Sequence, residues 1–328
     1  MSKFKAFLLL HGIVFLWGFT GILGKLLHLD AVIIVWYRVL IASAALAIFL
    51  LIKKSSFQLQ KHQILPVIAV GAVVALHWIT FYYAIQKSTA SLGILCLSTT
   101  TLHVVWLEPI LLKTPFHGRK LVFSLLVVLG VAFIARDFKG QLLVALELGL
   151  FSALLAGIFS VSNAKLSQSI PSSLLSFYEL ATGGIIISLF LLVNKMPLQA
   201  FELSLSDGLW LLFLGIGCTS FAFVAAIYLV KMLGAYTVSL TINLEPVYTI
   251  LLAAIILGEH QILSLEFYLG AVVIVAVLLL NAWWNRDKKK NCVILRLHEF
   301  KAYWHINHMD ALFWGGSSAR LGTRHPCK

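Results

Sequence analysis

An acidic residue inside a long apolar segment is the strongest chemical signal in this sequence. Glu245 lies ten residues into the run 235–258, where a carboxylate costs about 2.5–3.5 kcal/mol on insertion scales. Pro246 follows it and removes a helical hydrogen bond, and Asn243 precedes it by two residues. Transporters build solute sites at such broken helices. Glu245 and Asn243 are therefore candidate contacts for a proton or a substrate, and a structural kink with a buried, protonated Glu245 is the alternative.

Consecutive hydroxyl side chains occupy the middle of another apolar run. They are Ser98, Thr99, Thr100 and Thr101, and Thr100 stands at the position that matches Glu245 in the second half of the chain. Such hydroxyls can bond to their own helix backbone, which is a purely structural role. Their number also indicates that at least one faces a polar cavity, so Ser98, Thr99 and Thr100 are candidate substrate contacts.

Aromatic residues with polar tips lie near the middle of two further runs. His77 lies four residues before Phe81, and Trp78 lies four residues before Tyr82, which gives two adjacent stripes on one helix. Interfacial aromatic residues lie at helix ends instead. Trp17, Trp78 and Tyr82 thus favour the wall of a cavity for apolar or aromatic solutes, with His77 as a candidate proton carrier. Aromatic packing between helices is the competing interpretation.

Arg38 and Glu179 are equivalent by an internal repeat. The triplet 36–38 (Trp-Tyr-Arg) is matched by 177–179 (Phe-Tyr-Glu) at an offset of about 141 residues. Each charged residue lies about two turns from the start of its run, Arg38 toward the outside and Glu179 toward the inside. Snorkelling and helix capping explain both residues, so we expect structural roles, with gating as the alternative.

Apolar helices must position these residues, and the composition supplies them. Hydrophobic residues make up 60% of the chain and charged residues 12%, with a mean hydropathy of +0.96. A helix needs about 20 apolar residues to cross a bilayer. Ten runs meet or approach that length: 7–27, 31–52, 64–86, 90–112, 121–135, 142–164, 173–193, 208–230, 235–258 and 263–284. The predicted fold is all-α and integral to a membrane, with ten transmembrane helices.

The repeat divides these helices into two predicted domains, residues 1–140 and 141–285, with five helices each. An odd number of helices inverts the second copy across the membrane, and inverted repeats are a common architecture of secondary transporters. Lys and Arg are concentrated in the loops on the N-terminal side, which predicts that both termini are cytoplasmic. The net charge of +12 is then a topology signal, and no nucleic-acid partner is expected.

The segment 286–328 differs from everything before it and is expected to be a disordered cytosolic tail. A metal site could be built from Cys292, His298, His305 and His308, but their spacing fits no standard pattern. No Gly-Lys-Ser/Thr nucleotide-binding loop exists either, which argues against an ATP-driven pump. We therefore expect no metal and no cofactor.

Short motifs recur in order along the apolar runs. They are Leu16-Trp17-Gly18, the triplets 36–38 and 177–179, Leu244-Glu245-Pro246-Val247 and Leu257-Gly258-Glu259. Together they resemble the drug/metabolite transporter superfamily, in its ten-helix branch with two EamA-like repeats, over residues 8–280. The chain departs from that pattern at Thr101, where many members have Pro, and at 112–114, which replaces a Leu-Gly-Glu ending. The tail beyond Arg286 is a further departure.

The resemblance implies an exporter of amino acids, other metabolites or toxic compounds. It also implies a path lined by the first, third, fourth, sixth, eighth and ninth helices, which agrees with the polar and aromatic residues named above. Few fixed charges lie in the runs, which suits neutral, zwitterionic or amphipathic solutes better than sugar phosphates. We expect a lipid-embedded secondary transporter that works by alternating access, with protons as a candidate coupling ion.

The expected location is a cell membrane, the bacterial inner membrane in particular, with a monomer or a homodimer as the working form. Two other classes of protein compete with a transporter. A lipid-modifying enzyme would need clustered polar residues near one interface, and none is found, so no enzyme is expected. A scaffold or sensor would bind a partner through the tail, which is the one feature that favours it.

Overall fold

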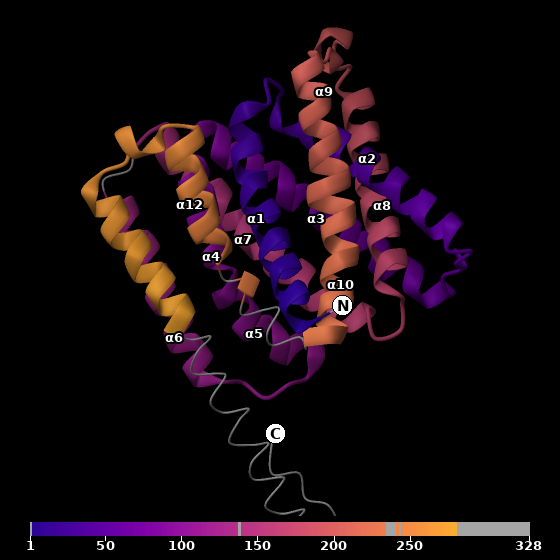
Figure 1. The fold of residues 1–328 in the computed structure, drawn as a ribbon, viewed down its shortest axis with the longest axis horizontal. Helices are drawn as coiled ribbons and strands as arrows, with labels where there is room; N and C mark the ends of the chain where they lie inside the picture. The colour runs from indigo at the N-terminus through magenta and orange to yellow at the C-terminus, as the bar shows by residue number, and fades with distance from the viewer. Residues whose placement is uncertain (1, 137–138, 234–240, 243, 281–328) are drawn as a thin grey trace, which may run out of the picture. The chain divides into compact units, whose positions relative to one another are not determined.

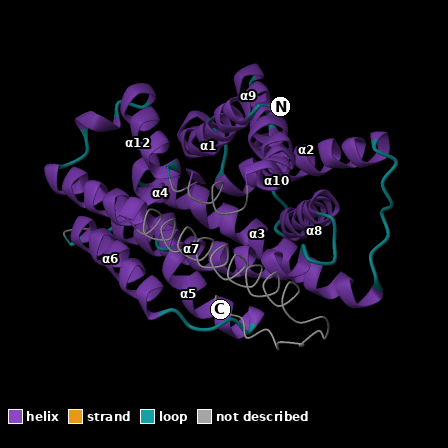
Figure 2. Cartoon of the chain, turned by 60° about the horizontal axis from the view of Figure 1, so that its bottom comes forward, coloured by secondary structure: helices purple, strands orange, loops and turns teal. Residues whose placement is uncertain are grey.

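The computed structural model describes residues 2–136, 139–233, 241–242 and 244–280, apart from the side chains of 227, 228 and 230–232. Every regular element in that part of the chain is a helix (Figure 1). Figure 2 shows these helices in purple, joined by loops that are mostly short. The predicted all-α class is therefore confirmed for the described residues.

The helices follow the predicted apolar runs closely. The described residues contain eight helical segments that are long and apolar enough to cross a membrane, and two shorter apolar helices. The elements are α1 (Lys3–Leu26), α2 (Ala31–Ile52), α3 (Lys61–Lys87), α4 (Ala90–Ser98), α5 (Thr100–Leu112), α6 (Gly118–Ala135), α7 (Gln141–Leu166), α8 (Ser172–Val193), η1 (Leu198–Phe201), α9 (Leu205–Leu212), η2 (Phe213–Phe221), α10 (Ala222–Leu233), α12 (Glu245–Ile256), η3 (Glu259–Gln261) and the helix Leu265–Leu280. Parts of the last two predicted runs lie outside the described residues, so ten crossings stay a prediction.

Three of the predicted runs are interrupted. The fourth breaks at Thr99, between α4 and α5, and the eighth contains η2, a π-helical stretch between α9 and α10. α12 begins at Glu245, with Pro246 in its first turn, where a helix loses no hydrogen bond to proline. The sequence predicted the interruption at Pro246, but it gave continuous helices for the fourth and eighth runs. Such π-helical turns occur frequently at functional sites.

Hydrophobic side chains cover the outside of the bundle as well as its interior. Ile52 and Val193 are 74% and 77% exposed, whereas Leu23 and Ile34 are fully buried. A helix that is apolar all round is expected in lipid. Because lipid supplies no hydrophobic drive for helix association, close packing at small residues takes its place.

Two glycines form a reciprocal contact between α6 and the helix Leu265–Leu280. A Cβ on Gly130 would lie 2.6 Å from Cγ1 of Ile274, and a Cβ on Gly270 would overlap Ile134. Gly130 and Gly270 are 140 residues apart in the sequence, close to the offset of the repeat, and Ile134 and Ile274 have the same separation. A two-fold axis produces such a reciprocal contact. The contact supports an internal repeat, and the inverted orientation of the halves stays a prediction.

The Leu-Gly-Glu ending of α12 joins two helices from different halves of the chain. Gly258 has a φ of 66°, a left-handed conformation that ends the helix at low cost. Glu259 then reaches the start of α4, where its carboxylate accepts the backbone N–H groups of Ala90 at 2.7 Å and Ser91 at 3.1 Å. It also accepts the Ser91 hydroxyl at 2.6 Å. The motif is therefore a helix stop followed by a cap for another helix.

Candidate functional site

Arg38 is buried where α2 meets α3 and η2. The residue is only 4% exposed, its Nε donates to Oγ1 of Thr219 at 3.0 Å, and its Nη1 donates to the Tyr82 hydroxyl at 3.4 Å. The guanidinium carbon lies 3.7 Å from the centre of the Trp78 ring, which is a cation–π contact. The expectation of snorkelling or capping is therefore wrong for Arg38. Hydroxyl and aromatic partners on facing helices let this cation stay inside.

Trp78 and Tyr82 lie on α3 as one stripe, and both turn toward Arg38. They are 7% and 0% exposed, and the Tyr82 hydroxyl also lies 3.4 Å from the backbone carbonyl of Thr20 on α1. The predicted stripe is thus present, and it surrounds a cation. The sequence had assigned the same two residues to the wall of an apolar cavity.

Glu245 lies in the first turn of α12 and keeps a partly exposed side chain. α12 is held against α1, because the Thr249 hydroxyl donates to the Gly18 carbonyl at 3.1 Å and Gly18 leaves room for the close approach of Tyr248. Free N–H groups at a helix start favour a carboxylate. A carboxyl group therefore stands at the start of α12, where that helix packs against α1.

Trp17 connects α1 to η2 beside the same group of residues. Its Nε1 donates to the carbonyl of Cys218 at 3.1 Å, and its ring packs edge-on against Phe223 at 6.2 Å between centroids. Cys218 directly precedes Thr219, the partner of Arg38. Of the candidate residues, Trp78 and Tyr82 thus contact Arg38, and Trp17 bonds to the residue next to its partner Thr219.

His77 belongs to a different contact, between α3 and α7. Its Nδ1 lies 2.8 Å from Oγ and 3.0 Å from the carbonyl oxygen of Ser152, and the Ser152 hydroxyl donates to the His77 carbonyl at 2.9 Å. The ring also stacks on Phe81 at 6.4 Å. This reciprocal pairing locks the two helices, so the geometry favours packing for His77.

The hydroxyl run is also engaged by backbone carbonyls. Thr99 donates to Cys96 at 2.7 Å, Ser98 lies 3.4 Å from the Ile94 carbonyl, and Thr100 donates to Ala153 of α7 at 3.2 Å. These contacts support the break at Thr99 and favour the structural interpretation of the run. The remaining candidate, Asn243, lies outside the described residues.

A comparison with family profiles shows which protein family the chain belongs to. The profile of the EamA-like transporter family matches residues 4–136 and, a second time, residues 143–283. The chain belongs to the EamA-like transporter family. The predicted resemblance is thereby confirmed, and together with the apolar helices it makes the chain a multi-pass membrane protein of a small-molecule transporter family. A search of the curated proteins finds no match.

A solved structure shares the fold of this EamA-like protein. It is described as "Crystal structure of protein", has 17% sequence identity to this chain, and matches it with a TM-score of 0.60. The match covers 87% of this chain and 99% of that chain. At this identity the likeness concerns the fold alone.

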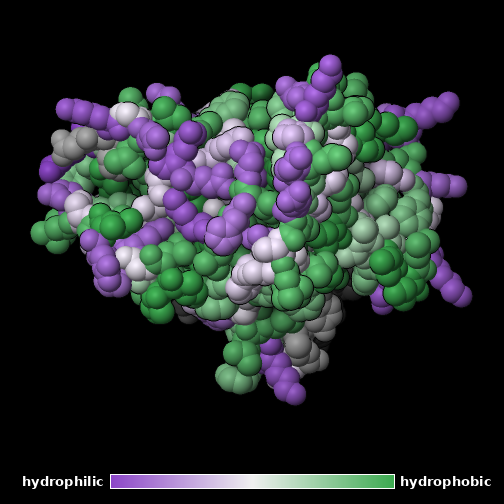
Figure 3. Space-filling view, turned by 90° about the horizontal axis from the view of Figure 1, so that it is seen from above, coloured by the Kyte–Doolittle hydropathy of each residue, from purple (hydrophilic) through white to green (hydrophobic). Residues whose placement is uncertain are grey.

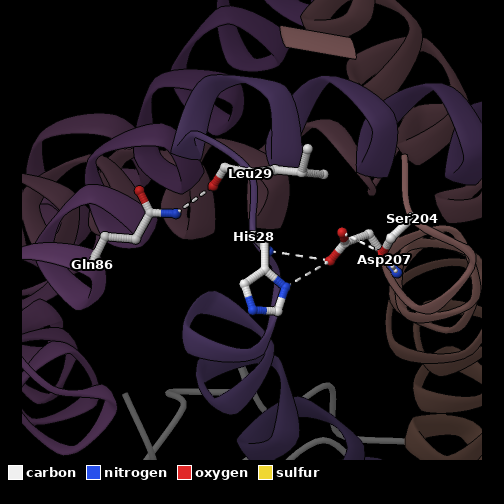
Figure 4. Close-up of polar contacts among 5 residues, drawn as sticks. All are labelled: His28, Leu29, Gln86, Ser204 and Asp207. Atoms are coloured by element: carbon white, nitrogen blue, oxygen red, sulfur yellow. Dashed lines mark hydrogen bonds and ion pairs between the residues drawn. The ribbon is translucent and has the colours of Figure 1, made fainter. Parts of the chain in front are cut away.

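Polar contacts tie together the loops at the upper end of this EamA-like bundle. Asp207, at the start of α9, accepts the backbone N–H of His28 at 3.1 Å and lies 3.5 Å from its Nδ1, while Gln86 donates to the Leu29 carbonyl at 2.8 Å (Figure 4). The hydroxyl of Ser204 donates to the same carboxylate at 2.6 Å. Figure 3 looks onto this end, where hydrophilic side chains gather across the middle. The α1–α2 loop is thus fastened to both halves of the chain.

Sequence reasoning missed two members of the EamA-like site. The repeat drew attention to Arg38, but the predicted role was snorkelling or capping near a helix end. Thr219 was not named as a candidate. The available signal was the polar pair Thr219-Ser220 in the middle of an apolar run, since the Ser220 hydroxyl contacts the Ala42 carbonyl of α2 at 3.0 Å. Pairing that signal with Arg38 would have required the contact between α2 and η2.

Proposed function

We propose that this protein is a secondary transporter that exports amino acids or related neutral or amphipathic metabolites by alternating access. Family membership supports transport of small molecules across a membrane. The substrate class, the direction and the mechanism are the content of the proposal. Transporters with internal repeats commonly hold their solute near mid-membrane, between the two repeats.

The observation that carries the proposal is the buried guanidinium of Arg38, held by Thr219, Tyr82 and Trp78, and we assign the Glu245 carboxyl at the start of α12 as its counterpart. A planar guanidinium suits a carboxylate, and a carboxylate suits an ammonium group, so a zwitterion fits both. Trp17 and Trp78 add aromatic surface beside the charges. Among the described residues Arg38 is the only buried Lys or Arg, and a single cation is too few for a sugar phosphate.

Alternating access requires contacts between the halves that can break and reform. At the upper end of the bundle His28 pairs with Asp207, and Ser91 pairs with Glu259. At the lower end Nε2 of Gln63 donates to the Ser169 hydroxyl at 3.2 Å. Water can replace polar contacts of this kind, because the net free energy of a hydrogen bond is only about 1 kcal/mol.

Proton coupling is proposed to involve Glu245 rather than His77. The Nδ1 of His77 is engaged with Ser152, whereas Glu245 is half-buried at the start of α12. The test is the pH dependence of flux in the variant Glu245→Gln. Loss of that dependence supports the role, and an unchanged pH profile contradicts it.

The substrate class is tested by competition in proteoliposomes that contain the full chain. Efflux of labelled amino acids is measured against an excess of the unlabelled amino acid, its amide and its deaminated acid. If Arg38 and Glu245 bind the two ends of the solute, the intact zwitterion competes at least about tenfold better than either analogue, which corresponds to about 1.4 kcal/mol. Equal competition by all three compounds contradicts the zwitterion.

A further inference from the structure

Glu179 is a buried carboxyl group with no cation among its contacts in the described part of the chain. The residue is 2% exposed, and its only hydrogen bond within the described region is to Asn163, whose Nδ2 donates to Oε2 at 3.1 Å. The other carboxyl oxygen, Oε1, and the Asn163 carbonyl oxygen, Oδ1, are both buried and have no partner among the described residues. Two neighbouring acceptors are thus left unsatisfied inside the bundle, and the expectation that Glu179 snorkels or caps a helix is wrong.

Helix packing explains why Glu179 is shielded from water in the conformation of this structure. α8 crosses α3 at this point, since a Cβ on Gly71 would lie 2.7 Å from the Glu179 carbonyl oxygen and 2.8 Å from Cβ of Thr182. One turn further along α8, Gly183 faces Ala75. The side chain is therefore confined between helices. A buried charge without a partner is strongly unfavourable, so the carboxylate form has little to stabilise it here.

A proton satisfies both unpaired oxygens at once. When Oε1 carries a proton, the carboxylic acid becomes a donor as well as an acceptor. An acid and a primary amide can then form two reciprocal hydrogen bonds, N–H to Oε2 and O–H to Oδ1. The first of these bonds is present in the structure, and the two unpaired oxygens are those that the second bond joins. The alternative amide orientation would turn Oδ1 toward the carboxyl group, and it would need a proton in the same way.

No other titratable group contacts Glu179 in the described part of the chain. The titratable and charged side chains on the packed helices are those of Tyr37, Arg38, Lys53, Lys61, His62, His77, Tyr82, Tyr83, Lys87, Glu147, Lys165 and Tyr178. None of them makes a hydrogen bond or an ion pair with Glu179, and the side chains of Tyr228 and Lys231 on α10 lie outside the description. Asn163 is the only partner, so a proton has no competing counter-ion in the described site.

We propose that Glu179 and Asn163 form a reversible proton-binding site between α7 and α8 that is used in the transport cycle. Uptake transfers a proton from hydronium to Oε1 and leaves water, and release reverses that step. Asn163 lies one turn before the end of α7, at the end of the bundle that is predicted to face the cytoplasm. The cycle role rests on the proposed transport function, whereas the proton site itself does not.

Infrared difference spectroscopy tests the site without any transport. Spectra of the full-length protein in liposomes are recorded as the pH is raised from about 6 to about 9, a range in which exposed carboxyl groups stay ionised. We expect a carboxylic C=O band that is lost on raising the pH, with one component that is absent in Glu179→Gln and shifted in Asn163→Leu. The matched control Glu147→Gln, an exposed carboxyl group on α7, keeps the band. Identical difference spectra for wild type and Glu179→Gln overturn the proposal.

Flux measurements with the same variants test the use of the site. Glutamine can form the same two hydrogen bonds with Asn163, so Glu179→Gln is expected to fold and to exchange labelled for unlabelled solute. Its stimulation by a pH gradient is expected to fall at least about tenfold, which corresponds to about 1.4 kcal/mol. Retained stimulation overturns the cycle role. If wild type carries no tested solute, the proposed substrate class fails, and the infrared result still decides the proton site.

Discussion

Arg38 and Glu179 occupy equivalent positions in the two repeats, but their environments differ. Three residues after Arg38, Ile41 packs against Gly215, and three residues after Glu179, Thr182 packs against Gly71. Both charged residues are buried next to a helix crossing of the same kind. Arg38 nevertheless has two hydrogen bonds and an aromatic ring, whereas Glu179 has one hydrogen bond and an unpaired oxygen.

One facing position accounts for much of the difference. Thr219 lies four residues after Gly215 and accepts from Arg38, but the residue four positions after Gly71 is Ala75, which has no polar atom. Glu179 therefore depends on Asn163 of a third helix. The two halves thus share the backbone packing at this crossing but differ in the polar partners of the charged residue. The Arg38 guanidinium keeps its charge, whereas the Glu179 carboxyl can gain or lose a proton.

Removing the fixed charge is expected to have the largest effect. Arg38→Met keeps an unbranched, apolar stem but loses the charged hydrogen bonds and the cation–π contact, so flux of a zwitterion should fall about 100-fold. The assay is counterflow in proteoliposomes at equal protein content. Lys53→Met, at the exposed end of the same helix, is the control and should transport normally. Wild-type flux in Arg38→Met would remove Arg38 from the site.

The cap made by Glu259 is expected to matter next. Glu259→Gln removes the negative charge of the group that accepts three hydrogen bonds at the start of α4. This loss should lower the free energy of unfolding by about 2 kcal/mol and lower the midpoint of thermal unfolding. Glu202→Gln, an exposed carboxylate in a loop, should leave the midpoint unchanged. If Glu259→Gln and Glu202→Gln have the same midpoint of thermal unfolding, the Leu-Gly-Glu motif does not join the two halves.

The reciprocal glycine contact predicts two equal effects. Gly130→Ala and Gly270→Ala each add a Cβ against an isoleucine, and each should cost about 1–3 kcal/mol by overpacking. Gly12→Ala, where a Cβ meets nothing within 4 Å, is the control for helix propensity. Melting midpoints that differ clearly between the two contact variants would show that the two-fold relation fails at this crossing.

The smallest expected effect compares the helix ends of the two halves. Lys113 has a φ of 55° and Gly258 has a φ of 66°, so both are left-handed. Lys113→Gly should therefore stabilise the protein by about 1 kcal/mol, and Gly258→Lys should destabilise it by a similar amount. The readout is again the midpoint of thermal unfolding. Shifts of the same sign in both variants would contradict the equivalence of the two ends.

Hydrophobic runs predicted most of the fold, because apolar helices are set by local composition. α2, Ala31–Ile52, has the predicted ends. The break at Thr99 and the π-helical turn of η2 were not predicted, since both depend on neighbouring helices and on hydroxyls bonding to carbonyls. Within the site, Trp78 and Tyr82 followed from their spacing on α3. The burial of Arg38 did not, because its cost is offset by Thr219, which is distant in the sequence.

Counterflow of labelled amino acids in proteoliposomes tests the central claim most directly, with wild type compared to Trp78→Ala. Trp78 lies against Arg38, and Trp106 on α5, which is 42% exposed, supplies the matched control Trp106→Ala. The account predicts saturable counterflow in wild type and Trp106→Ala, and loss of counterflow in Trp78→Ala. Counterflow that is absent for every amino acid, or equal in all three proteins, would contradict it.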